Sequence, residues 1–289
     1  MAPRLHITSG DIAGEVLAGS GLDGDILVWH DLLYEGPRSP GWPDDRILER
    51  RSCFIEQMSG GGLRAGEVLA TFKEQYGRIA DLSEDVQVVL WFDACLFDQS
   101  MLVHILNCLD MKKIRAGAEL LCIDRFEGVE PFIGLGQLSP LQLASVWPDR
   151  RPLTGEQFSY AARIDHIFAE NDFHRAEQIS KQHGAPLPWV SAALKRWLEE
   201  RPDPATGLGR LESMALDAVR AGCCKPWDIF NHVAAAETPP QFWGDTTLWL
   251  KINNLAGRRP PLVTITGPSE RLPQWICSVD LNEFAVRPC

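Results

Sequence analysis

The segment that most constrains the fold is residues 86–92 (VQVVLWF), an almost unbroken apolar run rich in β-branched side chains. Strands that are buried on both faces of a parallel sheet have this composition, whereas half-exposed strands alternate apolar and polar residues. The run is also far shorter than the roughly 20 residues that a membrane-spanning helix needs. It therefore predicts a strand at the centre of a parallel sheet that helices cover on both sides.

Patterns of strands and helices alternate around this run. Further strands are predicted at residues 5–9, 25–29 and 119–123, and helices at residues 12–18 and 99–109. Two amphipathic stretches, residues 44–58 and 66–79, are separated by three consecutive glycines and predict an inserted helical hairpin. This order predicts an α/β domain over residues 1–138, with an open parallel sheet, helices on both faces and a helical insertion near residues 44–79.

The second half of the chain shows helical patterns until near its end. Residues 139–203 form the predicted helical region, with helices at residues 139–147, 154–170, 173–183 and 188–200. Ser139 before Pro140, and Thr154 three residues before Gln157, are typical N-terminal helix caps. A linker is expected at residues 201–207. Residues 207–289 then predict three short helices and two strands, at residues 262–266 and 275–281, which are typical of a winged-helix-like unit.

The charge of the chain is negative and unevenly distributed. The 39 Asp and Glu residues outnumber the 28 Lys and Arg residues, and the net charge is −11. Residues 1–140 hold 22 of these acids and 12 of these bases, so this region carries a net charge of −10. Because nucleic-acid-binding proteins usually present a basic face to the phosphates, this charge disfavours a polyanionic partner.

Cysteine spacing and the N-terminal sequence indicate the expected compartment. Eight cysteines are scattered along the chain without a C-x-x-C pair, which disfavours a zinc site and indicates reduced thiols. The N-terminus lacks the cationic and then apolar pattern of a secretory signal. We therefore expect a cytoplasmic protein without a membrane partner.

Residues that follow the predicted strands are mostly acidic, and ligands bind beyond the carboxyl ends of strands in an open α/β sheet. The predicted ligand-binding residues are Ser9, Gly10, Asp11, His30, Asp98 and Gln99, and the predicted catalytic residues are Asp31, Glu35 and Asp93. Such carboxylates can transfer protons or hold a hard cation such as Mg²⁺, for which Asp11 and Asp31 are the predicted ligands. Alternatively, these acids cap the helices that follow the strands.

The leading hypothesis is a domain that binds or processes a small polar or phosphate-containing ligand at this acidic rim. One alternative is a regulator that binds DNA through its winged-helix-like unit, where Lys251, Arg258 and Arg259 would contact phosphates. Another is a protein-interaction module without catalysis, in which the C-terminal half binds a protein partner. The sequence leaves open whether the protein is an enzyme.

Several short motifs resemble those of a known family. They are residues 6–11 (HITSGD), 28–37 (VWHDLLYEGP), 90–93 (LWFD), 96–99 (LFDQ), 134–136 (GLG) and 242–245 (FWGD). Together they resemble bacterial proteins that contain the domain of unknown function 1835, followed by a second uncharacterised module. The resemblance implies an N-terminal α/β domain whose motif residues lie at the acidic rim, without implying a particular reaction.

Two positions depart from the pattern of that family. Residues 92–96 read FDACL where the family typically has Phe-Glu-His-Asp-Leu, and His30 stands where an arginine is usual. The loss of a histidine and an acid from the rim leaves ligand binding without catalysis as an alternative.

Overall fold

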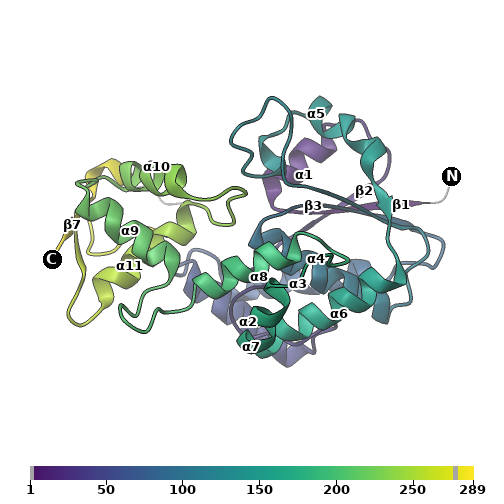
Figure 1. The fold of residues 1–289 in the computed structure, drawn as a ribbon, viewed down its shortest axis with the longest axis horizontal. Helices are drawn as coiled ribbons and strands as arrows, with labels where there is room; N and C mark the ends of the chain where they lie inside the picture. The colour runs from purple at the N-terminus through teal and green to yellow at the C-terminus, as the bar shows by residue number, and fades with distance from the viewer. Residues whose placement is uncertain (1–2, 276–278) are drawn as a thin grey trace.

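The computed structural model describes residues 3–275 and 279–289 and shows a mixed α/β protein (Figure 1). Its main sheet has five strands in the order β2-β1-β3-β4-β5. Their bounds are Arg4–Ser9 (β1), Asp25–Trp29 (β2), Gln87–Asp93 (β3), Ala118–Ile123 (β4) and Arg151–Pro152 (β5). The first four strands pair in parallel, and β5 pairs antiparallel with β4. The predicted parallel sheet is confirmed, and the short antiparallel edge strand was not predicted.

Strand β3 is buried on both faces. Val88, Leu90 and Phe92 pack into the core on one side of the sheet, while Val89 and Trp91 pack into a smaller core on the other side. All five side chains are fully buried. Successive side chains of a strand point to opposite faces, so burial of every residue requires a helical layer on each face.

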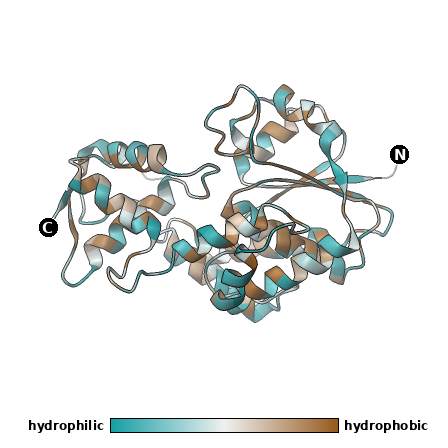
Figure 2. Cartoon of the chain, viewed as in Figure 1, coloured by the Kyte–Doolittle hydropathy of each residue, from teal (hydrophilic) through white to brown (hydrophobic). Residues whose placement is uncertain are grey.

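Helices cover both faces of the sheet (Figure 1). On one face lie α1 (Asp11–Ala18) and α5 (Pro140–Ser145), which contact each other, followed by the 3₁₀ turn η2 (Trp147–Asp149). On the other face lie α4 (Leu96–Met111), α6 (Gly155–Glu170) and α8 (Val190–Glu199), with α6 and α8 packed on α4. The predicted helical region therefore completes the layer that covers this face, and Figure 2 shows the apolar colouring concentrated around β3 and α4.

The inserted hairpin and the helix caps agree with the sequence patterns. Helices α2 (Asp45–Met58) and α3 (Ala65–Ala80) pack against each other, and Asp44 caps α2 by accepting a hydrogen bond from the Ile47 N–H. Ser139 and Thr154 form capping boxes at the starts of α5 and α6. Helix α7 (Phe173–Ser180) connects α6 to α8.

The C-terminal unit contains three helices and a two-stranded antiparallel sheet. Its elements are α9 (Arg210–Arg220), α10 (Pro226–Ala236), α11 (Asp245–Gly257), β6 (Val263–Thr266), the 3₁₀ turn η3 (Leu281–Glu283) and β7 (Ala285–Pro288). The second strand was predicted at residues 275–281, but the described residues of that range are not in a strand, and residues 276–278 lie outside the described residues. The strand that pairs with β6 is β7, and the winged-helix assignment stays a prediction.

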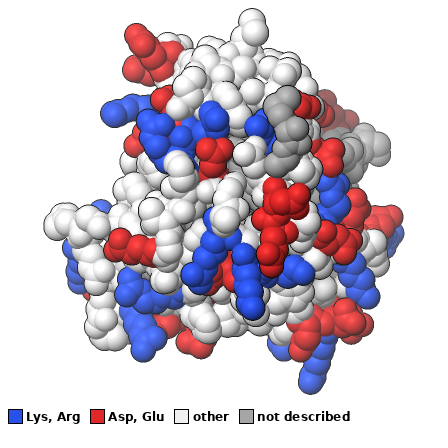
Figure 3. Space-filling view, turned by 90° about the vertical axis from the view of Figure 1, so that its right-hand side faces the viewer, with Lys and Arg blue, Asp and Glu red and all other residues white. Residues whose placement is uncertain are grey.

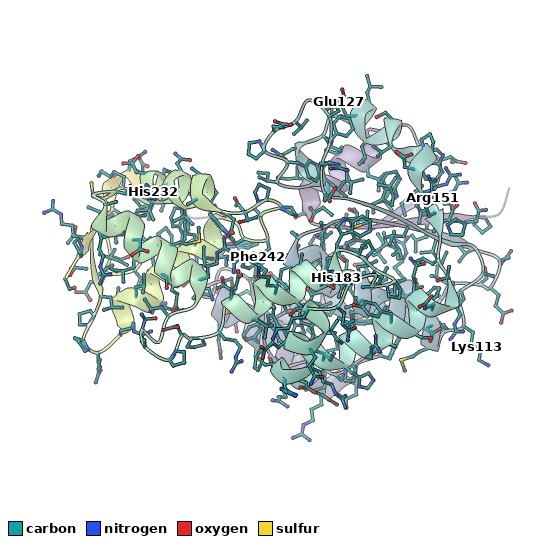
Figure 4. All side chains as sticks on the ribbon, viewed as in Figure 1. Lys113, Glu127, Arg151, His183, His232 and Phe242 are labelled. Atoms are coloured by element: carbon teal, nitrogen blue, oxygen red, sulfur yellow. The ribbon has the colours of Figure 1, made fainter. Side chains whose placement is uncertain are left out.

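Side-chain contacts hold the C-terminal unit against the α/β part. The Gln274 amide donates to the carbonyl of Met58 at the end of α2 (2.6 Å). Phe242 lies between the two parts (Figure 4) and contacts the Tyr34 ring edge to face. In the described part of the chain, no helix is long and apolar enough to cross a membrane.

Candidate functional site

The boundary between β1 and β3 is a topological switch point. Helix α1 follows β1 on one face of the sheet, whereas α4 follows β3 on the other, so the two connections diverge. Divergence of neighbouring connections leaves a crevice at the carboxyl ends of the two strands, and open α/β sheets bind ligands in such crevices. The site is therefore built from the residues that end β1 and β3.

A cavity of about 410 Å³ occupies this crevice, and we call it the polar cavity. Ser9, Gly10 and Asp11 line it from β1 and α1, and Asp93 and Asp98 line it from β3 and α4. Gly134 and neighbouring residues, which form the 3₁₀ turn η1 (Leu135–Gln137), cover one side, and Gln241, Phe242 and Trp243 of the C-terminal unit cover another. The structure thus brings together five of the predicted site residues.

Gly10 shapes the passage from β1 into α1. Its φ of 70° lies in the left-handed region, which favours glycine because a Cβ is strained there. No side chain caps the N-terminus of α1, and the first residues of that helix line the polar cavity. The positive end of the helix dipole therefore faces this cavity, with the acidic side chain of Asp11 in its first turn.

Asp93 and Asp98 form a buried carboxyl pair in the wall of the polar cavity. The Asp98 carboxylate accepts the backbone N–H of Asp93 (2.6 Å) and the hydroxyl of Ser9. The Asp93 carboxylate accepts the backbone N–H of Cys95 (2.8 Å). Both residues are more than nine-tenths buried. The N-cap of α4 is Cys95 rather than either acid, but hydrogen bonds tie both carboxyls to the turn between β3 and α4.

Burial favours the protonated forms of this pair. Desolvation raises the pKa of Asp93 from 3.8 to about 6, although hydrogen bonds from Cys95 and Leu135 oppose the rise. Desolvation, and then the nearby charge of Asp93, raise the pKa of Asp98 well above its ordinary value. Because a nearby like charge disfavours ionisation, the proximity of the two carboxyls and their burial act on the pKa values in the same direction.

Gly134 makes a close approach to this pair. A Cβ at residue 134 would lie 2.8 Å from Asp93 Oδ2, which is closer than carbon and oxygen atoms pack. The glycine therefore lets η1 cover the carboxyl group. Residues 134–136 (GLG), which are similar to the start of a dinucleotide-binding motif, here pack over the Asp93 side chain.

The carboxyl pair and the Cys95 thiol form a cluster of three potential metal-ligating groups within 4.8 Å of one another. Their chemistry does not fit Mg²⁺, which prefers oxygen ligands and retains several waters. Burial raises the pKa of the Cys95 thiol well above its ordinary value, and its sulfur accepts the Asp98 N–H (3.4 Å). Hydrogen bonds rather than a cation satisfy the charges of this cluster.

A second cavity, of about 550 Å³, lies next to the polar cavity, and we call it the aromatic cavity. Five aromatic side chains line it: Trp29, Phe72, Phe97, Phe242 and Trp275. Helices α2 and α3 and the C-terminal unit supply most of its other walls. Gly10, Asp11, Phe97 and Phe242 line both cavities, so the two are contiguous.

Asp11 and His30 form an ion pair at the shared rim. The His30 Nε2 lies 2.7 Å from Asp11 Oδ1, with 44% and 78% of the two side chains exposed. Both residues line the aromatic cavity, which agrees with their predicted place at the ends of β1 and β2. The structure therefore keeps Asp11 and His30 as accessible groups at the site.

Asp31 has a different role from the predicted one. Its carboxylate is 1% exposed and accepts hydrogen bonds to both oxygens from Arg51 Nε (2.6 and 2.8 Å). The rest of the Arg51 guanidinium donates to the carbonyls of Leu32, Glu35 and Pro37. Because Arg51 already supplies the positive charge, this geometry gives no support to the prediction that Asp31 is catalytic or binds Mg²⁺ with Asp11. Asp31 instead anchors the loop after β2.

Glu35 and Gln99 also lie away from the proposed chemistry. The Glu35 carboxylate is 3.5 Å from Lys251 Nζ and joins the α/β part to the C-terminal unit, so its predicted catalytic role is not supported. The Gln99 side chain is fully buried and donates to the Asp93 carbonyl (2.7 Å). Gln99 therefore supports the strand end beneath Asp93 and does not face the ligand.

The three predicted phosphate contacts of the C-terminal unit are unequal. Lys251 pairs with Glu35, and Arg258 donates to the carbonyl of Gly207 (3.1 Å), whereas Arg259 is exposed. Two of the three cations are thus engaged within the protein. At the opposite end of the molecule, which faces the viewer in Figure 3, acidic and basic side chains lie side by side. DNA binding loses support from these positions.

A buried polar network was not predicted. Asp165 on α6 is fully buried and accepts hydrogen bonds from the Asn107 amide (2.8 Å), the Gly41 N–H (2.5 Å) and Arg38. His104 Nδ1 lies 3.1 Å from the same carboxylate. Burial, with Arg38 and Arg51 nearby, lowers the pKa of His104 well below its ordinary value. The network ties the loop at residues 37–43 to α4 and α6.

These features define an α/β protein with a ligand-sized crevice at its switch point, which a helical C-terminal unit covers. Comparison with models of known protein families gives no match, and comparison with curated proteins gives none either. The functional class therefore rests on the fold and on the chemistry of the two cavities.

Proposed function

We propose that this chain binds a small polar ligand in the polar cavity and that the Asp93 and Asp98 pair exchanges a proton with it. The observation that carries the proposal is a buried carboxyl pair, hydrogen-bonded to Ser9 and to the end of β3, in the wall of a cavity at the switch point. Buried carboxyls with raised pKa values concentrate at sites of acid and base chemistry. Cavities of about 300–1,000 Å³ are typical of small-molecule sites.

The polar cavity supplies groups for binding as well as for proton transfer. With a pKa of about 6, Asp93 is able to gain and lose a proton near neutral pH. Ser9 donates its hydroxyl to Asp98, so a ligand hydroxyl that approaches Ser9 is linked to the pair by hydrogen bonds. The uncapped N-terminus of α1 adds backbone donors for a ligand oxygen. The proposed proton transfer uses these groups and needs no cation.

The expectation of a phosphate group loses support from the charges at the site. Among the described residues that line the polar cavity there is no Lys or Arg, whereas Asp11, Asp93 and Asp98 line it. Phosphate sites usually add a basic side chain to a helix N-terminus. A neutral polar group is therefore the better match for this cavity.

The motif residues support a proposed relationship to the family with the domain of unknown function 1835. Each of the six motifs places at least one residue in the wall of one or both cavities. These residues are Ser9, Gly10, Asp11, Trp29, His30, Asp31, Leu32, Asp93, Phe97, Asp98, Gly134, Leu135, Gly136, Phe242, Trp243 and Gly244. We propose that the motifs define one shared ligand site in that family.

The test is ligand binding to the wild type and to variants of the polar cavity. D-ribose, glycerol and serine are suitable neutral or zwitterionic probes, with binding followed by thermal shift and calorimetry. The Ser9→Ala and Asp98→Asn variants should weaken binding about tenfold, since each removes a hydrogen-bonding partner of the pair. Glu127→Gln is the control, because Glu127 is exposed at the outer edge of the α/β part (Figure 4).

Two results would contradict the proposal. One is binding that is equally strong in the Ser9→Ala, Asp98→Asn and control proteins. The other is a pKa of Asp93 near 4 in the wild type, measured by carbon-detected NMR titration of its carboxyl group. The second measurement needs no ligand and tests the carboxyl pair directly.

A further inference from the structure

The two cavities have an unusual balance of charge. None of their described lining residues is a Lys or Arg. Acids line both, with Asp11 at the shared rim, Glu67 on α3 beside the aromatic cavity, and the Asp93 and Asp98 pair in the polar cavity. In a region of low dielectric constant, such an arrangement attracts a cation and repels an anion.

Two largely buried basic side chains near the cavity walls are engaged in ion pairs. Arg51 pairs with Asp31, and Arg196, which stacks on the Phe242 ring at 4.6 Å, pairs with Glu200 and with Glu237. The Asp11 carboxylate lies 2.7 Å from His30 Nε2, and 78% of its side chain is exposed. Glu67 is exposed, and no ion pair involving it is found among the described residues. Asp11 and Glu67 thus place two exposed carboxylates at the rim of the aromatic cavity, and none of its described lining residues is a Lys or Arg.

The aromatic cavity adds a second source of attraction for cations. Trp29, Phe72, Phe97, Phe242 and Trp275 belong to five separate segments of the chain and contribute to the walls of one space. Trp29 and Phe72 are almost fully buried, so the accessible aromatic surface comes mainly from Phe97 and Trp275. The face of an aromatic ring carries partial negative charge, and it attracts organic cations within about 6 Å. Aliphatic residues such as Leu32, Ile55 and Val68 complete the walls and suit an apolar body.

We propose that the aromatic cavity binds an organic cation, namely a primary amine attached to a flat apolar group. The apolar group packs among the aromatic side chains, and the ammonium group lies near Asp11 and Glu67. This inference rests on the proposed function in one respect, since it takes the polar cavity to bind the remaining polar part of the same ligand. Beyond the proposed function, the inference specifies the charge and the shape of that ligand.

The test compares three probes of nearly equal shape by calorimetry: 2-phenylethylamine, 2-phenylethanol and phenyl phosphate. The amine should bind at least about tenfold more tightly than the alcohol, and the phosphate should bind most weakly. The amine should also lose affinity as sodium chloride rises from 20 to 200 mM, because the acids lie at a partly exposed rim. Equal binding of amine and alcohol, or tighter binding of the phosphate, would overturn the inference.

Substitutions at the rim test whether Glu67 and Asp11 cause the preference for the amine over the alcohol. Glu67→Gln and Asp11→Asn should each weaken the amine several-fold and leave the alcohol unchanged. Glu74→Gln is the matched control, because Glu74 is an exposed acid on the same helix and does not line either cavity. Both test residues are exposed, so their variants should fold. Loss of amine binding that is equal in the control would also overturn the inference.

The two proposals fail in different ways. If ribose, glycerol or serine binds in a manner that depends on Ser9 while the amine does not bind, the proposed function stands and the cation inference is wrong. If the amine binds through Glu67 while Ser9→Ala and Asp98→Asn change the binding of no probe, the aromatic cavity is a cation site and the proposed proton transfer is wrong.

Discussion

The Asp31→Asn substitution separates an anchoring role from a catalytic one. In the wild type, Asp31 and Arg51 are 1% and 2% exposed, and the guanidinium has no other acidic partner in the described hydrogen-bond network. Removal of the carboxylate charge leaves Arg51 buried with backbone carbonyls alone. Breaking a buried pair in this way costs about 3–5 kcal/mol. For a chain of 289 residues, about 3 kcal/mol lowers the melting temperature by about 5 °C.

The control lies at the opposite end of β2, the strand that precedes Asp31. Asp25 at the start of β2 pairs with Arg78 at 3.9 Å, but the two side chains are 85% and 40% exposed. Asp25→Asn should therefore leave stability almost unchanged. Urea unfolding followed by tryptophan fluorescence measures both variants. If Asp31→Asn costs less than about 1 kcal/mol, or no more than Asp25→Asn, the anchoring role of Asp31 is refuted.

Three further predictions concern the carboxyl pair and the buried network. Because the folded protein raises the pKa of Asp93 to about 6, the free energy of unfolding of the wild type should fall by about 2 kcal/mol relative to Asp93→Asn as the pH rises from 4.5 to 7.5. Urea unfolding at both pH values measures this difference, and a rise over the same range would contradict the prediction. Gly134→Ala should lower the free energy of unfolding by about 1–3 kcal/mol, because the added Cβ meets the Asp93 side chain. An unchanged free energy of unfolding would show that η1 is free to move. Asp165→Asn should cost about 3 kcal/mol in the same assay, as it leaves Arg38 buried without a carboxylate, and Asp172→Asn, at an exposed helix cap, should cost clearly less.

The sequence predicted the sheet because the evidence for it is local. The apolar run in β3, the alternation of strands with helices and the capping residues Ser139 and Thr154 each act within a few positions along the chain. Strand β5 was not predicted because it has only two residues, both exposed and one a proline, and so shows no detectable periodicity. Strand β7 (Ala285–Pro288) was not predicted, since the expected second strand was assigned to residues 275–281, of which 276–278 lie outside the described residues.

The candidate site was only partly predictable, for a physical reason. The position of an acid after a strand indicates the correct edge of the sheet, and Ser9, Gly10, Asp11, Asp93 and Asp98 do line one cavity. Whether a carboxylate is free depends on partners that the sequence does not mark.

The partners of the other acids are distant in the sequence. Asp31 meets Arg51 from the inserted hairpin, 20 positions away, Glu35 meets Lys251 across 216 positions, and Arg38 meets Asp165 across 127. The unusual number of charged residues around the loop after β2 was the available signal. It did not distinguish internal ion pairs from a ligand site.

The shared walls of the two cavities also set an order of events during synthesis. Asp11 lies near the start of the chain, whereas Phe242 and Trp275, which line the same aromatic cavity, lie near its end. A nascent chain can form the sheet while it is still attached to the ribosome, but its ligand cavity has no complete wall until the C-terminal unit has emerged and docked. A ligand that binds the finished cavity should then stabilise this docking by mass action, so that binding itself reports that the C-terminal unit has docked.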